Sequence, residues 1–266
     1  MTAGRAIARR TALAALLAAA AVASVQAAPN APARVRAFAR LPDWTGIWLS
    51  DSEQSDLGGR TAASRFQFMS PPPYNPVWEV QHQARLARMK TKATADAPTI
   101  RSCIIDFPAT MESPQPFELI VTPEETVFTA GDGTFRHIFT DGRGHPGKDD
   151  LWPTITGHSI GHWEGDTLVV DTVARSPGPD RYLGLAAYSA SAHFIERIRM
   201  TGKDRLEDRM TIEDPEAFTR PWTLTLGFSR VTFIDRLDPY YCELDDRTRV
   251  VDGKLVILPP ADEAPH

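Results

Sequence analysis

Short runs of alternating apolar and polar residues fill the second half of the chain, and turn residues separate them at regular intervals. Alternation with a period of two is typical of strands with one buried face, and Gly-Asp or Glu-Gly pairs between runs are typical of hairpin turns. The runs predict strands at residues 117–121, 126–129, 134–139, 157–163, 166–173, 193–200, 205–212 and 222–235. Such an antiparallel meander predicts an all-β fold, either a lipocalin-like barrel or a bent sandwich.

Helical spacing is clear at one place. Apolar residues recur at intervals of three and four across residues 77–92, and Pro76 stands at the first helical position, which tolerates proline. The polar segment 51–76 ends in three prolines and predicts an irregular arm. We expect a leader at 1–27, a tether and first strand at 28–50, an arm with one peripheral helix at 51–100, and a β-barrel body at 101–266.

The N-terminus has the pattern of an export signal. Basic residues that include Arg9 and Arg10 precede an apolar stretch at 11–25, and the small residues Val25 and Ala27 suit signal peptidase. We therefore expect cleavage after Ala27 and a periplasmic or secreted protein. An uncleaved anchor helix is the alternative, but this stretch is short and mostly alanine. The Arg9-Arg10 pair also leaves the twin-arginine route open.

The composition of the chain limits which binding partners are expected. The 266 residues include 34 acidic and 29 basic side chains, which gives a formal net charge of -5. Nucleic acid is a poor partner for an acidic chain, because binding it needs a basic face. No run of 18 apolar residues follows the leader, so we expect no membrane span. The oligomeric state stays open.

The chain has two cysteines, Cys103 and Cys242. An oxidising compartment favours a disulfide between them. Two buried free thiols are the alternative. A catalytic thiol is disfavoured, because no histidine or basic residue is adjacent to either cysteine to lower its pKa.

The segment Trp44-Thr45-Gly46-Ile47-Trp48 carries a Gly-x-Trp pattern. The pattern resembles the first strand of lipocalin-type barrels. That resemblance implies that Trp48 closes one end of the barrel with an arginine packed over it, and that a ligand cavity lies inside an eight-stranded barrel.

Three longer motifs resemble an uncharacterised family of exported, β-rich bacterial proteins. They are FTDGRGHP at 139–146, GHSIGHWEGDTLVVDT at 157–172 and TIEDPEAFTRPW at 211–222. The resemblance spans residues 103–242 and implies a secreted β-rich protein without implying an activity. Members often carry a basic residue where this chain has His162, and a second histidine shortly before His193, where residues 186–192 contain none.

The hairpin at 157–173 carries the candidate chemistry. Alternation puts His158 and His162 on one face, and Asp171 on the partner strand approaches His158 if the register allows. A carboxylate fixes an imidazole tautomer and raises its basicity, so this pair suits acid–base catalysis. A structural polar pair is the alternative. We take His158, Asp171 and His193 as the candidate catalytic residues.

The loop after residue 139 supplies candidate binding residues. Asp141, Arg143 and His145 lie among turn residues, and together they suit a polar ligand. Turn formation alone is the competing explanation.

Two further candidates depend on which strand faces are internal. Arg197 shares a face with His193 and would anchor an anionic or carbonyl substrate if that face is internal; otherwise Glu196 is internal. Trp163 is one of several aromatics that suit either a ligand pocket or the core.

A metal site is not assigned. His158 and His162 have the spacing of a helical ligand pair, but on a strand their rings lie about 13 Å apart. If a divalent metal binds, the remaining candidate ligands are Asp141, His145, His158 and His193. No cofactor is expected, because no glycine-rich phosphate loop or dinucleotide motif is present.

The sequence therefore predicts an exported protein that holds a small, partly apolar ligand in a β-barrel pocket. Whether it is an enzyme stays open, with cofactor-free lyase, isomerase or hydrolase chemistry at His158, Asp171 and His193 as the first hypothesis. A non-catalytic binding or carrier protein is the direct alternative, and a surface interaction module is the third.

Overall fold

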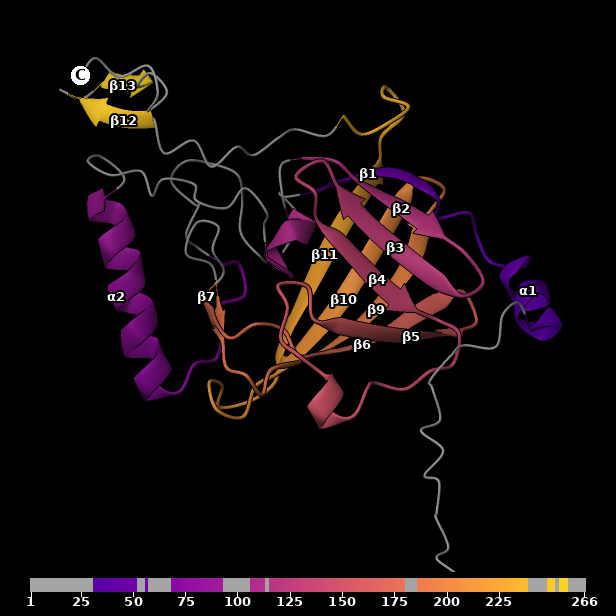
Figure 1. Ribbon diagram of the computed structural model, residues 1–266, viewed down its shortest axis with the longest axis horizontal. Helices are drawn as coiled ribbons and strands as arrows, with labels where there is room; N and C mark the ends of the chain where they lie inside the picture. The colour runs from indigo at the N-terminus through magenta and orange to yellow at the C-terminus, as the bar shows by residue number, and fades with distance from the viewer. Residues whose placement is uncertain are drawn as a thin grey trace, which may run out of the picture.

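The computed structural model describes residues 31–51, 56, 68–92, 106–112, 115–179, 186–238, 248–251 and 254–257. Nine strands close into one barrel in the order β1-β11-β10-β9-β6-β5-β4-β3-β2 (Figure 1). Their bounds are β1 Gly46–Ser50, β2 Phe117–Val121, β3 Glu125–Ala130, β4 Phe135–Phe139, β5 His158–Glu164, β6 Thr167–Val173, β9 His193–Gly202, β10 Arg205–Glu213 and β11 Trp222–Arg230. The all-β prediction is confirmed, and closure selects the barrel over the sandwich.

The remaining elements are not strands of the barrel wall. They are the helices α1 Pro32–Phe38 and α2 Pro76–Lys92, the 3-10 turns η1 Ala109–Glu112 and η2 Lys148–Asp150, and the strand pairs β7 Gly178–Pro179 with β8 Ala187–Tyr188 and β12 Thr248–Val251 with β13 Lys254–Ile257. Helix α2 is the predicted helix, and Figure 1 shows it beside the barrel. Helix α1 was not predicted; it begins at a proline in the expected tether.

One strand pair departs from the predicted antiparallel meander. Strands β4 and β5 pair in parallel, with Ile138 opposite Ser159 and Phe139 opposite Ile160. Parallel neighbours need a long crossover, and the connection at residues 140–157 supplies it. Every other neighbouring pair in the barrel is antiparallel. This crossover carries the loop that holds several of the predicted site residues.

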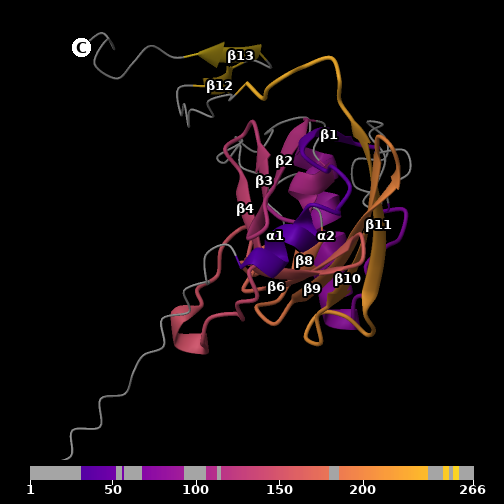
Figure 2. The same ribbon diagram turned by 90° about the vertical axis from the view of Figure 1, so that its right-hand side faces the viewer.

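Figure 2 shows the barrel strands turned by 90° from the first view. Along these strands alternate residues are buried and face the barrel interior. Buried side chains that form this core include Trp48, Phe117, Phe128, Leu168, Val170, Phe194, Leu206, Met210, Leu224, Leu226 and Phe228. On β6 the buried positions are Leu168, Val170 and Thr172, so Asp171 faces outward. The predicted site face of the 157–173 hairpin is therefore the outer wall.

A buried tryptophan on β1 lies under an arginine from the end of β11. Trp48 is fully buried, and the guanidinium carbon of Arg230 lies 4.3 Å from the centre of its ring. Arg230 also donates to the carbonyl oxygens of Thr45 and Asp43 at 2.6 and 2.7 Å. A Cβ on Gly46 would stand 2.7 Å from Nη1 of Arg230, so only glycine leaves room for this arrangement.

Within the described part of the chain, no helix combines the length and the apolar character that crossing a membrane requires. The expected leader at 1–27 lies outside the described residues, as do Cys103 and Cys242. The predicted cleavage and the predicted disulfide stay predictions.

Candidate functional site

Four polar side chains that were predicted as site residues meet on the outer wall of the barrel. His158 begins β5, Asp171 lies on β6, His193 begins β9, and His145 comes from the loop after β4. Asp171 is paired with Ile160 on one side and Ile195 on the other, so it lies between the strands of the two histidines. We call His145, His158, Asp171 and His193 the histidine cluster.

The cluster is a chain of contacts around one carboxylate oxygen. Nε2 of His193 lies 2.8 Å from Oδ1 of Asp171, and Nε2 of His145 lies 3.2 Å from the same oxygen. Nδ1 of His145 lies 2.8 Å from Nδ1 of His158. The predicted approach of Asp171 to His158 is therefore made through His145, which stands between them.

These contacts define where the protons lie when the histidines are neutral. An ionised carboxylate only accepts hydrogen bonds, so His145 and His193 donate to Asp171 through Nε2. Neutral His145 then has its lone pair on Nδ1 and accepts a hydrogen bond from Nδ1 of His158. The lone pair of His158 is left on Nε2, which bonds to none of the residues that the structure describes.

Local backbone geometry positions His158. Gly157, immediately before it, has φ +70°, and a Cβ at this position would stand 2.8 Å from both Cγ2 of Thr172 and the carbonyl oxygen of Val173. Only glycine fits so close to β6 with this backbone. The sequence Gly157-His158 therefore brings the imidazole to the edge of the strand that carries Asp171.

The surroundings of His158 favour its neutral form. Burial lowers its pKa below the ordinary 6.5, and the positive charge of Arg143 lowers it further. A histidine with a lowered pKa is an unprotonated base at neutral pH.

The preceding loop is built around Asp141. Its carboxylate accepts hydrogen bonds from the backbone N–H and the side chain of Arg143, at 3.0 Å for the backbone. Burial acts to raise the pKa of Asp141, but the Arg143 hydrogen bonds outweigh it and the pKa lies below its usual value. Arg143 packs over the ring of Phe139, which in turn lies 5.7 Å from the His158 ring. Asp141 and Arg143 therefore belong to the same surface as the histidine cluster.

Two predicted binding residues lie elsewhere. Trp163 packs edge-on against Trp44, 4.9 Å between ring centres, and contacts the core. Arg197 is on the outer wall, where it donates to Glu164 at 2.8 Å and lowers the pKa of that carboxyl. The His193 face is external, so Glu196 is the internal residue.

The positions of the candidate metal ligands do not support a metal site among the described residues. Among the described residues, no group of three or more His, Cys, Asp or Glu side chains is arranged to hold a metal ion. His145 directs its two nitrogens to different partners, and Asp141 is engaged by Arg143.

Sequence reasoning missed a buried polar centre inside the barrel. Arg136 on β4 is 1% exposed and pairs with Glu196 on β9, which is fully buried. It also donates to Ser159 at 3.1 Å and to Thr172 at 2.8 Å. The neighbouring Asp208 is fully buried beside Glu196. Burial, reinforced by the charge of Glu196, raises the pKa of Asp208 well above its ordinary value.

Glu213 was also missed. It lies opposite His193 in the β9–β10 pair, and its Oε2 is 3.8 Å from Nδ1 of His193. A bulge at Arg205/Leu206 shifts the register of this hairpin, so a regular four-residue turn would not have paired these residues.

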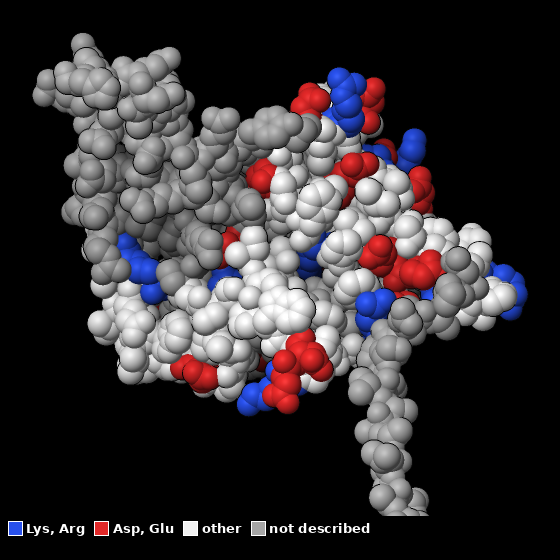
Figure 3. Space-filling view, in the orientation of Figure 1, with Lys and Arg blue, Asp and Glu red and all other residues white. Residues whose placement is uncertain are grey.

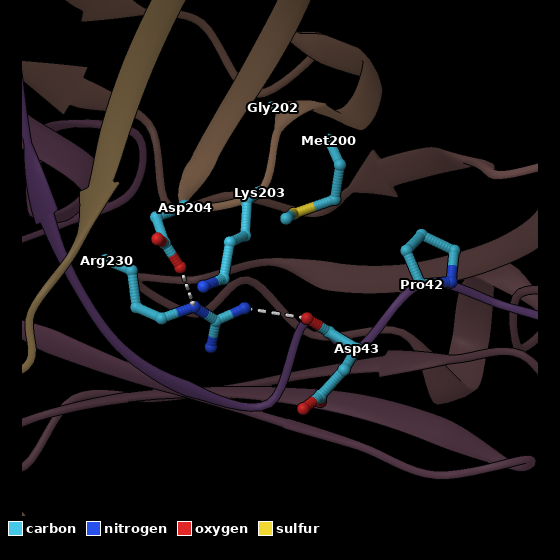
Figure 4. Close-up of a pocket in the computed structure, with 7 residues that line it drawn as sticks. All are labelled: Pro42, Asp43, Met200, Gly202, Lys203, Asp204 and Arg230. Atoms are coloured by element: carbon cyan, nitrogen blue, oxygen red, sulfur yellow. Dashed lines mark hydrogen bonds and ion pairs between the residues drawn. The ribbon is translucent and has the colours of Figure 1, made fainter.

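A separate hollow of about 640 Å³ lies beside Arg230 (Figure 4). Its lining is Pro42, Asp43, Met200, Gly202, Lys203, Asp204 and Arg230. None of the predicted site residues contributes to it. Arg230 is occupied there by the carbonyl of Asp43 and by Asp204, 3.3 Å away.

Acidic and basic residues are interspersed on the described surface in Figure 3, without a large patch of one sign on that face. No protein-family model matches the chain. No curated protein matches it either.

Proposed function

We propose that the protein is exported, that it binds a small molecule at the histidine cluster, and that it transfers protons on this molecule without a cofactor, as a lyase, isomerase or hydrolase. The observation that carries the proposal is the 2.8 Å contact between Nδ1 of His145 and Nδ1 of His158. It leaves the Nε2 lone pair of His158 as the proton acceptor.

The proposed step uses His158 as the base and the other two residues to position and stabilise it. Nε2 of His158 takes a proton from the substrate or from a water molecule, and the ring becomes a cation. His145 accepts the Nδ1 hydrogen bond of that cation and donates to Asp171 in turn. The negative charge of Asp171 therefore favours the protonated pair, and His158 returns the proton to the product.

The second histidine on Asp171 limits the motion of the carboxylate. His193 donates a hydrogen bond to Oδ1 of Asp171, and the same oxygen accepts the hydrogen bond from His145. Two donors on one oxygen fix its direction, so His193 is a positioning residue in this proposal. Glu213 lies on the other side of the ring, with its Oε2 3.8 Å from Nδ1 of His193.

The ligand in this proposal lies against the outer wall. Large apolar side chains occupy the interior between the described strands, whereas His145 and His193 are 20% and 32% exposed. Phe139, beside His158, offers an apolar surface to a partly apolar ligand. Export is supported by the basic and apolar pattern of residues 1–27.

The test is a thermal-shift screen of the purified mature chain with sugars, aromatic acids, terpenoid-like compounds and divalent metals, followed by NMR detection of turnover for each stabilising compound. His158→Ala is the test variant. His162→Ala is the matched control, because His162 is on the same face of β5 and contacts Glu164 instead of the cluster. We expect His158→Ala to lower turnover by about 10²–10⁴-fold and His162→Ala to leave it unchanged.

Binding without turnover, unchanged in His158→Ala, would contradict catalysis and favour a carrier. Stabilisation by a metal alone, lost in His158→Ala, would contradict the cofactor-free assignment.

A further inference from the structure

Arg143 is held rigidly by a buried carboxylate. Its Nε lies 2.8 Å and its Nη2 lies 2.5 Å from Oδ2 of Asp141, whose side chain is 1% exposed. Arg34 donates to the backbone carbonyl of Asp141 at 2.5 Å and ties α1 to the loop. A guanidinium fixed through one edge loses little further freedom when the rest of it binds a ligand.

Asp141 binds Nε and Nη2 of Arg143, so the side of the guanidinium that carries Nη1 is the side suited to a ligand. The Arg143 side chain is 26% exposed, and Nη1 bonds to none of the residues in the described ranges. Its Cζ lies 3.9 Å from the centre of the Phe139 ring. The same Phe139 ring lies beside His158. The guanidinium and the imidazole therefore flank one aromatic side chain.

The charge of Arg143 also reaches His158. It contributes to lowering the pKa of the imidazole, which agrees with their positions around Phe139. No comparable role is open to Arg197, whose guanidinium is bound to Glu164 further along the wall.

We infer that the substrate carries a carboxylate or a similar anionic group, and that Arg143 binds this group beside the proton that His158 removes. The inference rests on the proposed function and names its substrate class. Phe139 contacts the apolar part of the same molecule. The anion-binding residue is therefore Arg143, and Asp141 is its positioning residue.

This arrangement matches the charges of the reaction. When a C–H or O–H bond of the substrate breaks, its proton forms the new N–H bond at Nε2 of His158, and the electron pair stays on the substrate. Arg143 stabilises the negative charge that develops next to the bound carboxylate. The proton then returns to another atom of the substrate in an isomerisation, or to the leaving group in an elimination.

The experiment uses benzoate as the probe and benzamide as its uncharged match. The pKa of His158 is followed by NMR of its ring C–H signals in the full mature chain. Saturating benzoate places a negative charge beside the ring, so we expect the pKa to rise, whereas benzamide leaves it unchanged. Arg143→Gln removes the benzoate effect. Arg199→Gln keeps it, because Arg199 is an exposed residue bound to Glu207.

Equal responses to benzoate and benzamide, or a benzoate response that persists in Arg143→Gln, would overturn the inference. The ligand-free spectrum tests the proposed function separately, since it reports which nitrogen of His158 carries the proton. A His158 with its lone pair on Nε2 and no benzoate response would refute the anionic substrate and leave the base in place.

Discussion

Nδ1 of His145 and Nδ1 of His158 lie 2.8 Å apart, close enough that only one of them carries the proton between the two rings. The other nitrogen of His145 faces Asp171, so the position of that proton depends on a carboxylate that His158 does not contact. Asp171 therefore influences which nitrogen of His158 carries the proton, and it acts through the His145 ring that lies between them.

The first prediction concerns Asp171. Asp171→Ala removes the acceptor for Nε2 of His145 and His193, so both rings lose the tautomer preference imposed by the carboxylate. Imidazole nitrogen NMR should show each ring moving toward a mixture of tautomers. Because Asp171 is 45% exposed, the free energy of unfolding should change by less than about 1 kcal/mol. Asp166→Ala, in the neighbouring β5–β6 turn, is the control; identical spectra for both variants would disprove the role of Asp171.

The second prediction separates steric fit from backbone strain at the start of β5. Gly157 and Gly165 have similar φ angles of +70° and +65°, but a Cβ on Gly157 meets Val173 and Thr172 whereas a Cβ on Gly165 meets nothing within 4 Å. Gly165→Ala should cost about 1 kcal/mol for the left-handed backbone alone. Gly157→Ala should cost distinctly more in urea unfolding and should shift the His158 NMR signals. Equal costs would show that the close approach to β6 does not matter.

The third prediction concerns the buried ion pair inside the barrel. Arg136→Met leaves Glu196 as an unpaired buried carboxylate, and Glu196→Leu leaves an unpaired buried guanidinium. Each change should cost about 3–5 kcal/mol in the free energy of unfolding. The double variant removes both charges and should be less destabilised than the sum of the two. Strict additivity in denaturant unfolding would be inconsistent with a direct pair.

The fourth prediction concerns Asp208. Its pKa is raised well above 3.8 by burial and by Glu196, so the folded protein binds a proton there at pH values where the unfolded chain does not. Stability therefore falls as the pH rises from about 3.8 toward the raised pKa. Asp208→Asn should abolish this decline and stabilise the protein by about 1–3 kcal/mol at neutral pH. Thermal unfolding from pH 4 to pH 8 measures this effect, with the exposed Asp166→Asn as the control; parallel curves for wild type and Asp208→Asn would refute it.

Much of the barrel could be predicted from the sequence, because alternation and turn residues act locally. The hairpin at 157–173 is clear from its own residues, and so is α2. The parallel pairing of β4 with β5 was not predictable in this way, since it depends on the path of residues 140–157, which have no periodic pattern.

Which side chains of a strand point into the barrel was harder to predict than where the strand begins and ends. On β4 the aromatic Phe135 and Phe139 alternate with Arg136 and Ile138, so hydrophobicity alone would turn the arginine outward. In the folded chain Phe135 is 60% exposed and Arg136 is buried, because the Glu196 carboxylate on β9 compensates the guanidinium. A long-range ion pair of this kind leaves no local signal.

The residues of the candidate site were predictable, but their order of contact was not. His145, His158 and Asp171 stand in the motifs at 139–146 and 157–172, and His193 begins a predicted strand. The position of His145 between His158 and Asp171, however, depends on the conformation of the loop. Trp163 and Arg197 were grouped with them by residue type and lie apart from them.

The most direct test of the account is the proton position and pKa of His158 in the ligand-free protein, measured by imidazole NMR across a pH titration. We predict a neutral ring with its proton on Nδ1 and a pKa below 6.5, in line with its burial and the nearby positive charge of Arg143. A proton on Nε2 of the neutral ring, or a pKa above 6.5, would contradict the assignment of His158 as the base.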